Sequence, residues 1–261
     1  MISSIVESYK KKVHILNLIS QHFNKQLIEN TEPLNYCLDR VRDRETIDTF
    51  LLGYGKGIQD LINKESVREE ELIELGILTD NDTFLYDKFD DRVIFPIFDI
   101  SGNVVGLSGR VWRESDNRSK YIISNNTDVF QKSLSLYGLY QSLPFIKKYK
   151  TVFVVEGNVD VISSYREGIK ITVSPFGTSF MKEHLLLLRQ FADIFIFCQD
   201  ADKGGKKSVE RIKKLVQEEN IKAGFINLPE KEKDPDNFIK KYGSSPLIES
   251  IIDIRNQLLS V

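Results

Sequence analysis

Two strand-like segments that end in carboxylates constrain the fold of this chain most strongly. Residues 151–155 and 194–198 are short runs of β-branched and aromatic residues, which is typical of buried strands, and a helical pattern follows each. The acids after the first run are Glu156 and Asp160, and those after the second are Asp200 and Asp202. In an open α/β sheet the carboxyl ends of parallel strands meet at one edge, where ligands bind. The sequence therefore predicts an α/β fold with an acidic site at that edge.

The four acids indicate a metal site. Carboxylates that converge without a cation repel one another and raise each other's pKa values, so a bound metal would stabilise the cluster. The donor set consists of oxygen atoms, which favours Mg²⁺ or Mn²⁺ and excludes zinc as the expected metal. The alternative is that these acids are solvated loop residues or helix caps, which is the usual role of a single Asp-x-Asp sequence. Their distribution over two strand–helix junctions favours the metal site.

Composition limits the class of protein. The chain has 261 residues, of which 41% are hydrophobic and 28% charged, as in ordinary soluble globular proteins. We expect Cys37 and Cys198 to be small buried residues in a reducing cytoplasm, and two cysteines at this spacing do not form a zinc site. No apolar run approaches the roughly 18 residues of a membrane span. We therefore expect a cytoplasmic protein.

A local excess of positive charge precedes the acidic junctions. Residues 103–150 contain eight Lys or Arg and three Asp or Glu, a net charge of +5, whereas the whole chain has a net charge of −2. A basic surface that holds a polyanion, combined with an acidic metal site, is what nucleotide polymerisation requires. A solvated charged face is the alternative.

Two turns are predicted upstream of this segment. Residues 100–103 predict the turn of a β-hairpin. The glycine-rich residues 52–57 predict a turn and not a phosphate loop, because they lack the Gly-Lys-Ser/Thr ending of such a loop.

The acidic junctions resemble a known domain. The order Glu156-Gly…Asp160, then Gly177-Thr178, then Asp200-x-Asp202 is similar to the Toprim domain of bacterial-type primases, topoisomerases and some nucleases. These enzymes perform Mg²⁺-dependent phosphoryl transfer. Gly177 would let the backbone approach the site, and Thr178 would supply a hydroxyl. A plain turn explains both residues equally well without the resemblance.

The preceding segment extends the resemblance to the RNA polymerase domain of bacterial and phage DnaG-type DNA primases, over about residues 33–238. The matching motifs are Arg92-Val-Ile-Phe-Pro-Ile-Phe-Asp, Gly102-Asn-Val-Val-Gly-Leu-Ser-Gly-Arg110, Lys120-Tyr, Phe130-Gln-Lys132 and Leu136-Tyr-Gly-Leu-Tyr140. The resemblance implies a Toprim core, a parallel sheet flanked by helices, preceded by a mixed α+β basic subdomain. We expect domains at residues 1–145 and 146–243 and a short helical tail at 244–261.

The resemblance also implies roles for individual residues. The candidate residues for binding template or nucleotide are Arg92, Arg110, Lys120, Lys132, Gly177 and Thr178. The four basic residues among them are the candidates for phosphate contacts. Asp234 and Asp236 correspond to a third acidic pair of the family. The expected metal-binding residues are Glu156, Asp160, Asp200, Asp202, Asp234 and Asp236. Glu156, Asp200 and Asp202 are the expected catalytic residues, and Glu156 is either a metal ligand or a base.

Three positions depart from the family pattern. The family usually has Asn-Ser-Pro-Glu-Thr where this chain has Ile123-Ser-Asn-Asn-Thr127, so the polar contact expected at Ile123 is absent. Asn158 stands where an aromatic residue is common, and Gly204 replaces an alanine. Every acidic residue of the Toprim pattern is kept.

The resemblance implies a DNA primase catalytic core. Such an enzyme makes short RNA primers from ribonucleoside triphosphates on single-stranded DNA by Mg²⁺-dependent nucleotidyl transfer. The chain has no Cys/His zinc spacing, so we expect it to act with a replicative helicase, a separate zinc-binding primase subunit, or both. Two alternatives are a Toprim-type metal-dependent nuclease and a non-catalytic single-stranded-DNA-binding replication subunit. The basic segment disfavours the first, and the intact acids disfavour the second.

Overall fold

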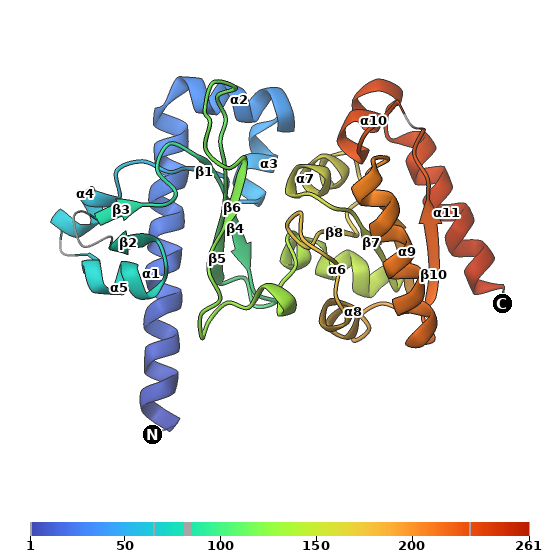
Figure 1. Cartoon of the computed structure of the whole chain (residues 1–261), viewed down its shortest axis with the longest axis horizontal. Helices are drawn as coiled ribbons and strands as arrows, with labels where there is room; N and C mark the ends of the chain where they lie inside the picture. The colour runs from blue at the N-terminus through green and yellow to red at the C-terminus, as the bar shows by residue number, and fades with distance from the viewer. Residues whose placement is uncertain (1, 65, 81–84, 230, 261) are drawn as a thin grey trace. The chain divides into compact units, whose positions relative to one another are not determined.

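The structure is a computed structural model that describes residues 2–64, 66–80, 85–229 and 231–260. The chain divides into a first unit, Met1–Lys132, and a second unit, Ser133–Val261 (Figure 1). The expected domain limits, 1–145, 146–243 and 244–261, stay predictions. Within the described residues, no helix has both the length and the apolar composition that crossing a bilayer demands.

The first unit is organised around one long helix. Its helices are α1 (Ile2–Glu29), α2 (Thr31–Val41), α3 (Arg44–Thr49), α4 (Ile58–Asn63) and α5 (Glu69–Glu74). Helix α1 buries Leu16, Ile19, Phe23 and Leu27 completely or nearly so. Their spacing of three and four residues puts them on one face of the helix, which contacts the sheet of this unit. The core of the first unit therefore lies along this face of α1.

The sheet of the first unit is antiparallel. Its order is β1-β4-β5-β6, and a separate hairpin pairs β2 with β3. The strands are β1 (Gly53–Tyr54), β2 (Leu78–Asp80), β3 (Leu85–Asp87), β4 (Val93–Phe98), β5 (Val104–Arg110) and β6 (Tyr121–Ile123). The predicted hairpin between β4 and β5 is confirmed. The predicted turn was wrong at Gly53 and Tyr54, because these residues pair with β4. A Cβ on Gly53 would lie 2.8 Å from the Cβ of Phe23, so glycine lets this strand lie against α1.

The second unit contains the predicted parallel sheet flanked by helices. Its order is β10-β9-β7-β8, and every pairing is parallel. The strands are β7 (Thr151–Val154), β8 (Thr172–Val173), β9 (Ile194–Cys198) and β10 (Lys222–Ile226). All residues of β7 and β9 are buried, which explains why both read as continuous apolar runs. Cys198 ends β9, and both it and Cys37 are buried free thiols, as expected.

The helices of the second unit show where local signals were incomplete. They are α6 (Leu139–Tyr149), α7 (Asn158–Arg166), α8 (Lys182–Leu188), α9 (Lys203–Glu218), α10 (Pro235–Tyr242) and α11 (Ser245–Leu259). Sequence patterns missed α6, which contains Pro144, because an internal proline normally signals an interruption. Helix α9 begins at Lys203, directly after Asp202, whose side chain caps it.

Candidate active site

Glu156 and Asp200 are joined where two neighbouring strands end. Glu156 lies just beyond β7, and Asp200 lies just beyond β9, which pairs with β7. The backbone amide of Asp200 donates a 3.1 Å hydrogen bond to Oε1 of Glu156. The parallel pairing thus brings together the two junctions that the sequence pattern singled out.

Asp160 connects the first turn of α7 to the start of α10. Its Oδ2 accepts a 3.1 Å hydrogen bond from the amide of Gly157, and its Oδ1 accepts a 3.2 Å bond from the amide of Asp236. The side chain is buried, with 6% exposure for the residue. A Cβ on Gly157 would lie 2.8 Å from Oδ2 of Asp160, so glycine leaves room for this carboxylate.

The last acidic pair has two different roles. Asp234 caps α10 by accepting a 2.8 Å hydrogen bond from the amide of Asn237. Asp236 is buried, and its two oxygens accept bonds from the Ser163 hydroxyl at 2.8 Å and the Lys240 ammonium group at 2.6 Å. Lys240 therefore balances the charge of Asp236, whereas Asp234 remains a source of negative potential.

The carboxylates around β7 and β9 destabilise one another's charged forms. Burial, followed by the charges of Glu156, Asp234 and Asp202, raises the pKa of Asp200 to about 7. Burial, followed by the charges of Asp234 and Asp200, raises the pKa of Asp160 well above its ordinary value. Burial also raises the pKa of Glu156, against the effect of the Asp200 amide. This edge of the sheet therefore carries negative charge that the protein alone does not neutralise.

The donors at this edge suit a hard divalent cation. Oδ1 of Asp200 is buried and has no hydrogen-bond partner among the described residues, and a buried acceptor in that state is costly. The nearby donors are carboxylate oxygens, as Mg²⁺ prefers. Within the described ranges, no three His, Cys, Asp or Glu side chains are already gathered as a metal-binding group. The acidic edge therefore fits such a cation in the chemistry of its donor atoms and in its negative charge.

Asp202 and Gly205 shape the start of α9. Oδ1 of Asp202 accepts a 2.8 Å hydrogen bond from the amide of Gly205, and the carboxylate faces solvent. A Cβ on Gly205 would lie 1.9 Å from the carbonyl oxygen of Asp200. Sequence reasoning gave Gly205 no role. The close contact shows that this glycine sets the position of Asp200.

The turn at residues 175–178 is tied to Glu156. The amide of Gly177, at a φ of +75°, donates a 2.7 Å hydrogen bond to the carbonyl of Glu156. The Thr178 hydroxyl donates a 2.6 Å bond to the carbonyl of Pro175 within the same turn. The structure thus places Gly177 beside Glu156, while the hydroxyl of Thr178 stabilises the turn.

Arg211 is a site residue that sequence reasoning missed. Its guanidinium donates to the hydroxyls of Ser179 at 2.7 Å and Ser208 at 3.3 Å, and its charge opposes the rise that burial causes in the pKa of Glu156. It lines a cavity of about 440 Å³ together with Ser179 and Lys214. The available signal was its place on the helix that Asp202 caps. Arg211 therefore brings positive charge to the acidic edge.

A second missed residue is Asn158, at the first position of α7. It is 2% exposed, and its Oδ1 accepts a 3.4 Å hydrogen bond from the Ser174 hydroxyl. The departure from the family's aromatic residue thus introduces a buried polar contact between α7 and the end of β8.

The predicted phosphate-binding residues lie in the first unit and differ in exposure. Arg92 is 3% exposed, and its guanidinium donates a 2.8 Å hydrogen bond to the carbonyl of Ser119. Lys120 is exposed, and Arg110 and Lys132 are partly exposed. Arg110 donates a 2.6 Å bond to the hydroxyl of Tyr121. Arg92 therefore holds the loop that precedes β6, while the other three side chains reach solvent.

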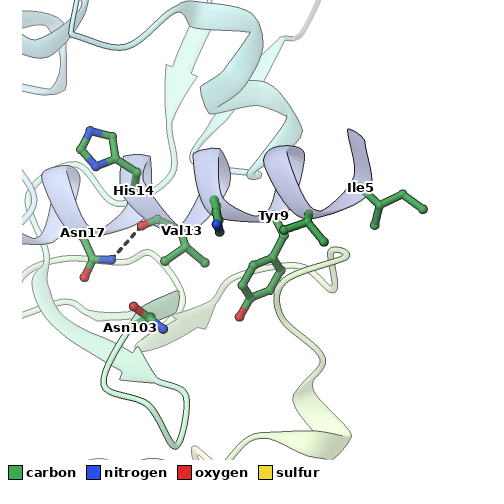
Figure 2. Close-up of a pocket in the computed structure, with 8 residues that line it drawn as sticks. Ile5, Tyr9, Val13, His14, Asn17 and Asn103 are labelled. Atoms are coloured by element: carbon green, nitrogen blue, oxygen red, sulfur yellow. Dashed lines mark hydrogen bonds between the residues drawn. The ribbon is translucent and has the colours of Figure 1, made fainter. Parts of the chain in front are cut away.

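The first unit also has a groove of about 670 Å³ along the amino-terminal part of α1 (Figure 2). Its lining residues are Ile5, Val6, Tyr9, Lys10, Val13, His14, Asn17 and Asn103. This set contains one lysine and no arginine or carboxylate, so it fits neither a metal nor a phosphate chain. The groove is not part of the candidate active site.

Two family profiles match the chain. Residues 22–143 match "DNA primase catalytic core, N-terminal domain", and residues 153–239 match "Toprim-like". Together they cover both the basic segment and the acidic junctions. A Toprim-type domain is typical of proteins that bind divalent metals.

Named relatives and solved structures agree with these profiles. The chain is 34% identical to a DNA primase of Clostridium acetobutylicum over 262 residues, which cover 95% of this chain and 43% of that protein. The Aquifex aeolicus primase structure, containing zinc-binding and RNA polymerase domains, is similar with a TM-score of 0.85 and 30% identity, covering 95% of this chain and 61% of that one. A DnaG primase catalytic domain bound to single-stranded DNA has a TM-score of 0.83 and 27% identity, with coverage of 96% and 82%. The chain thus spans less than half of the length of the Clostridium acetobutylicum protein.

Proposed function

This chain belongs to the DnaG-type primases, as their catalytic core with its Toprim domain, and we propose from this premise that it synthesises short RNA primers on single-stranded DNA. Ribonucleoside triphosphates are its proposed substrates, and the chemistry is nucleotidyl transfer. This proposed activity is the one that the names of the related proteins state.

One observation carries the chemical part of the proposal. Oδ1 of Asp200 is buried and has no hydrogen-bond partner within the part of the chain that the structure describes. Burial, followed by the charges of the neighbouring carboxylates, raises the pKa of Asp200 to about 7. This state is costly unless a cation binds there. The oxygen donors of Glu156, Asp200 and Asp202 would hold Mg²⁺ or Mn²⁺, with Asp160, Asp234 and Asp236 around them.

When bound, the metal supplies charge that neutralises the triphosphate and lowers the pKa of the attacking 3′-hydroxyl. The chain's own residues prepare the site. Glu156 fixes the backbone of Asp200 through the 3.1 Å hydrogen bond. Asp160 joins α7 to α10, and Arg211 contributes positive charge near Glu156. Phosphoryl transfer depends mainly on such positioning and electrostatic stabilisation.

The basic residues of the first unit are the proposed contacts to nucleic acid. We assign phosphate contacts to Arg110, Lys120 and Lys132, because these side chains reach solvent. Arg92 supports these contacts indirectly, because its hydrogen bond to the carbonyl of Ser119 holds the loop that precedes Lys120. A related catalytic domain has been solved with single-stranded DNA, which supports a DNA template as the partner.

Further partners follow from the family. The Aquifex aeolicus relative carries a zinc-binding domain beside its RNA polymerase domain. We propose that this chain works with a zinc-binding primase subunit, a replicative helicase, or both, in the cytoplasm, or in a host's cytoplasm if a phage encodes it. The nuclease alternative would use the same carboxylates, and the match of residues 22–143 to a primase core argues against it.

The direct test is primer synthesis. The protein would be incubated with single-stranded DNA, labelled ribonucleotides and Mg²⁺, beside the double variant Asp200→Asn/Asp202→Asn. Asp193→Asn is the matched control, because Asp193 is exposed and precedes β9 at the opposite end of the same strand. We expect labelled primers from the native protein and the control and none from the double variant. Absence of primers even with helicase and zinc subunit supplied would refute the proposal, and cleavage of the DNA would favour the nuclease.

A further inference from the structure

A buried carboxylate holds the segment that leads into α10. Glu232 is 5% exposed, although it lies in neither a helix nor a strand. Its Oε1 accepts a hydrogen bond from the Lys241 ammonium group and a second one, of 3.2 Å, from the Tyr242 hydroxyl. Lys241 and Tyr242 are the last two residues of α10. Glu232 therefore ties the chain just before α10 to the far end of the same helix.

The residue after Glu232 contacts the acidic edge. The backbone amide of Ala201 donates a 2.9 Å hydrogen bond to the carbonyl of Lys233. Ala201 lies between Asp200 and Asp202. Lys233 directly precedes Asp234. This bond therefore joins the backbone of residues 200–202 to that of residues 234–236.

The position of the Lys233 carbonyl depends on how Glu232 is held. Strand β10 ends at Ile226 and α10 begins at Pro235, so Lys233 lies in the connection between them. Within this connection the amide of Glu232 donates a 2.8 Å hydrogen bond to the carbonyl of Pro229, which forms a local turn. The Glu232 side chain fixes that turn to α10. The carbonyl that accepts the Ala201 amide follows it by one residue.

The start of α10 is fixed by other contacts. The amide of Asp236 donates a 3.2 Å hydrogen bond to Oδ1 of Asp160, and Lys240 donates a 2.6 Å bond to Oδ2 of Asp236. These bonds tie α10 to α7 without Glu232. Loss of the Glu232 carboxylate should therefore release Lys233 and leave the first turn of α10 in place.

The Glu232–Lys241 ion pair is better suited to fixing a geometry than to adding stability. The Glu232 side chain is 7% exposed and that of Lys241 is 54% exposed. A buried charge pair contributes little net stability, because the cost of removing its charges from water offsets their attraction. Residues that orient metal ligands from outside the ligand set, in contrast, typically change metal affinity by about 10- to 100-fold when they are replaced.

We propose that Glu232 is a positioning residue for the metal site. It holds the carbonyl of Lys233, this carbonyl fixes the amide of Ala201, and residues 200–202 are thereby kept in place relative to Asp234. The inference rests on the proposed function, because it concerns the cation for which these acids are candidate ligands. The competing explanation is that the ion pair only stabilises α10.

The first test measures Mn²⁺ binding by the full chain, from the electron paramagnetic resonance signal of the free ion. Glu232→Ala should weaken Mn²⁺ binding by about 10- to 100-fold. The matched control is Glu219→Ala. The Glu219 side chain is 18% exposed and pairs with Lys182, at the opposite end of α9 from Asp202. The control also loses a partly buried ion pair, and it should keep the native Mn²⁺ affinity.

The second test follows hydrogen exchange of two backbone amides by NMR in the presence of chelator. In Glu232→Ala the amide of Ala201 should exchange faster than in the native protein. The amide of Asp236, which is bonded to Asp160, should exchange at the native rate. A purely stabilising ion pair would instead change both rates together or neither of them.

A variant of the partner residue supplies an independent test, which applies even if Glu232→Ala does not fold. Lys241→Ala should also weaken Mn²⁺ binding. The double variant Glu232→Ala/Lys241→Ala should lose no more affinity than Glu232→Ala alone, because Lys241 acts through Glu232. Additive losses in the double variant would contradict this route.

The positioning role is overturned if Glu232→Ala and Lys241→Ala bind Mn²⁺ as tightly as the native protein, or if exchange of the Ala201 amide is unchanged. Primer synthesis is measured on the same samples. Primers made by a native protein whose Mn²⁺ affinity does not depend on Glu232 refute the positioning role and leave the proposed function intact. Glu232-dependent Mn²⁺ binding without primers refutes the proposed function and leaves the positioning role intact.

Discussion

The backbone amide of Asp236 donates a hydrogen bond of 3.2 Å to Oδ1 of Asp160. These residues are 76 positions apart, and the bond joins the first turn of α7 to the first turn of α10. The other oxygen of Asp160 accepts the amide of Gly157. Asp160 therefore holds α7 and α10 together at the acidic edge and also adds to the negative charge there.

Replacing Asp160 by alanine should destabilise the second unit. The amides of Gly157 and Asp236 lose their acceptor, and each buried unsatisfied group costs about 1–3 kcal/mol. Removal of a buried charge offsets part of this, so we expect a net loss of about 1–2 kcal/mol in the free energy of unfolding, measured with urea. Asp253→Ala, at an exposed position of α11, is the control. An Asp160→Ala protein as stable as the control would contradict the structural role.

Replacing Asp200 by asparagine should stabilise the metal-free protein and abolish its response to metal. Burial and the neighbouring acids disfavour the charged form of Asp200, and asparagine keeps the shape without the charge. We expect a higher Tm than that of the native protein in chelator. A ligand that binds only the folded state raises Tm, so Mg²⁺ or Mn²⁺ should raise the Tm of the native protein and of Asp193→Asn but not that of Asp200→Asn. An equal metal response in all three proteins would rule out Asp200 as a ligand.

Two adjacent glycines should respond in opposite ways to alanine. A Cβ at Gly205 would lie 1.9 Å from the backbone oxygen of Asp200, so Gly205→Ala must displace the start of α9. We expect a loss of about 1–3 kcal/mol in stability and loss of primer synthesis. At Gly204 the nearest atom is Oδ1 of Asp202, a side-chain oxygen, at 3.1 Å. Gly204→Ala, which restores the family's usual residue, should be neutral or stabilising by up to about 1 kcal/mol. Denaturation curves of both variants measure the change in the free energy of unfolding. Equal changes in the two variants would contradict this account of the start of α9.

Asp87 should make the stability of the first unit depend on pH. Burial raises the pKa of Asp87 to about 6, despite the hydrogen bond from the Phe89 amide. A carboxyl whose pKa is higher in the folded state contributes stability below its unfolded pKa of about 4, and this contribution is lost as the pH rises through about 6. Asp87→Asn should therefore gain stability relative to the native protein between pH 4 and pH 7, by roughly 1–3 kcal/mol at about 1.4 kcal/mol per pKa unit.

The measurement for Asp87 is urea denaturation at a series of pH values. Asp39→Asn, an exposed acid on α2, is the control and should follow the native curve. A constant difference between Asp87→Asn and the native protein across this range would show that Asp87 titrates normally.

The local pattern of the sequence was sufficient for the parallel sheet and for the acids at its edge. Continuous apolar runs at 151–155 and 194–198 mark strands that are buried on both faces, and the residues after them must lie at the carboxyl ends. The β4–β5 hairpin was equally predictable, because its turn residues and strands are neighbours in the chain. In these cases each turn or acid directly follows its strand, so the chain itself places it at the end of that strand.

Only the tertiary structure decided which of these groups carry charge, which are buried and which have partners. Asp236 is neutralised by Lys240 and bonded to Ser163, Arg92 is buried against Ser119, and Arg211 acts on Glu156. Desolvation and contacts between distant segments set these properties, and residue type and spacing do not encode either. The sequence by itself determined that acids gather at one edge of the sheet. The tertiary structure determined that Oδ1 of Asp200 is buried and, among the described residues, has no hydrogen-bond partner.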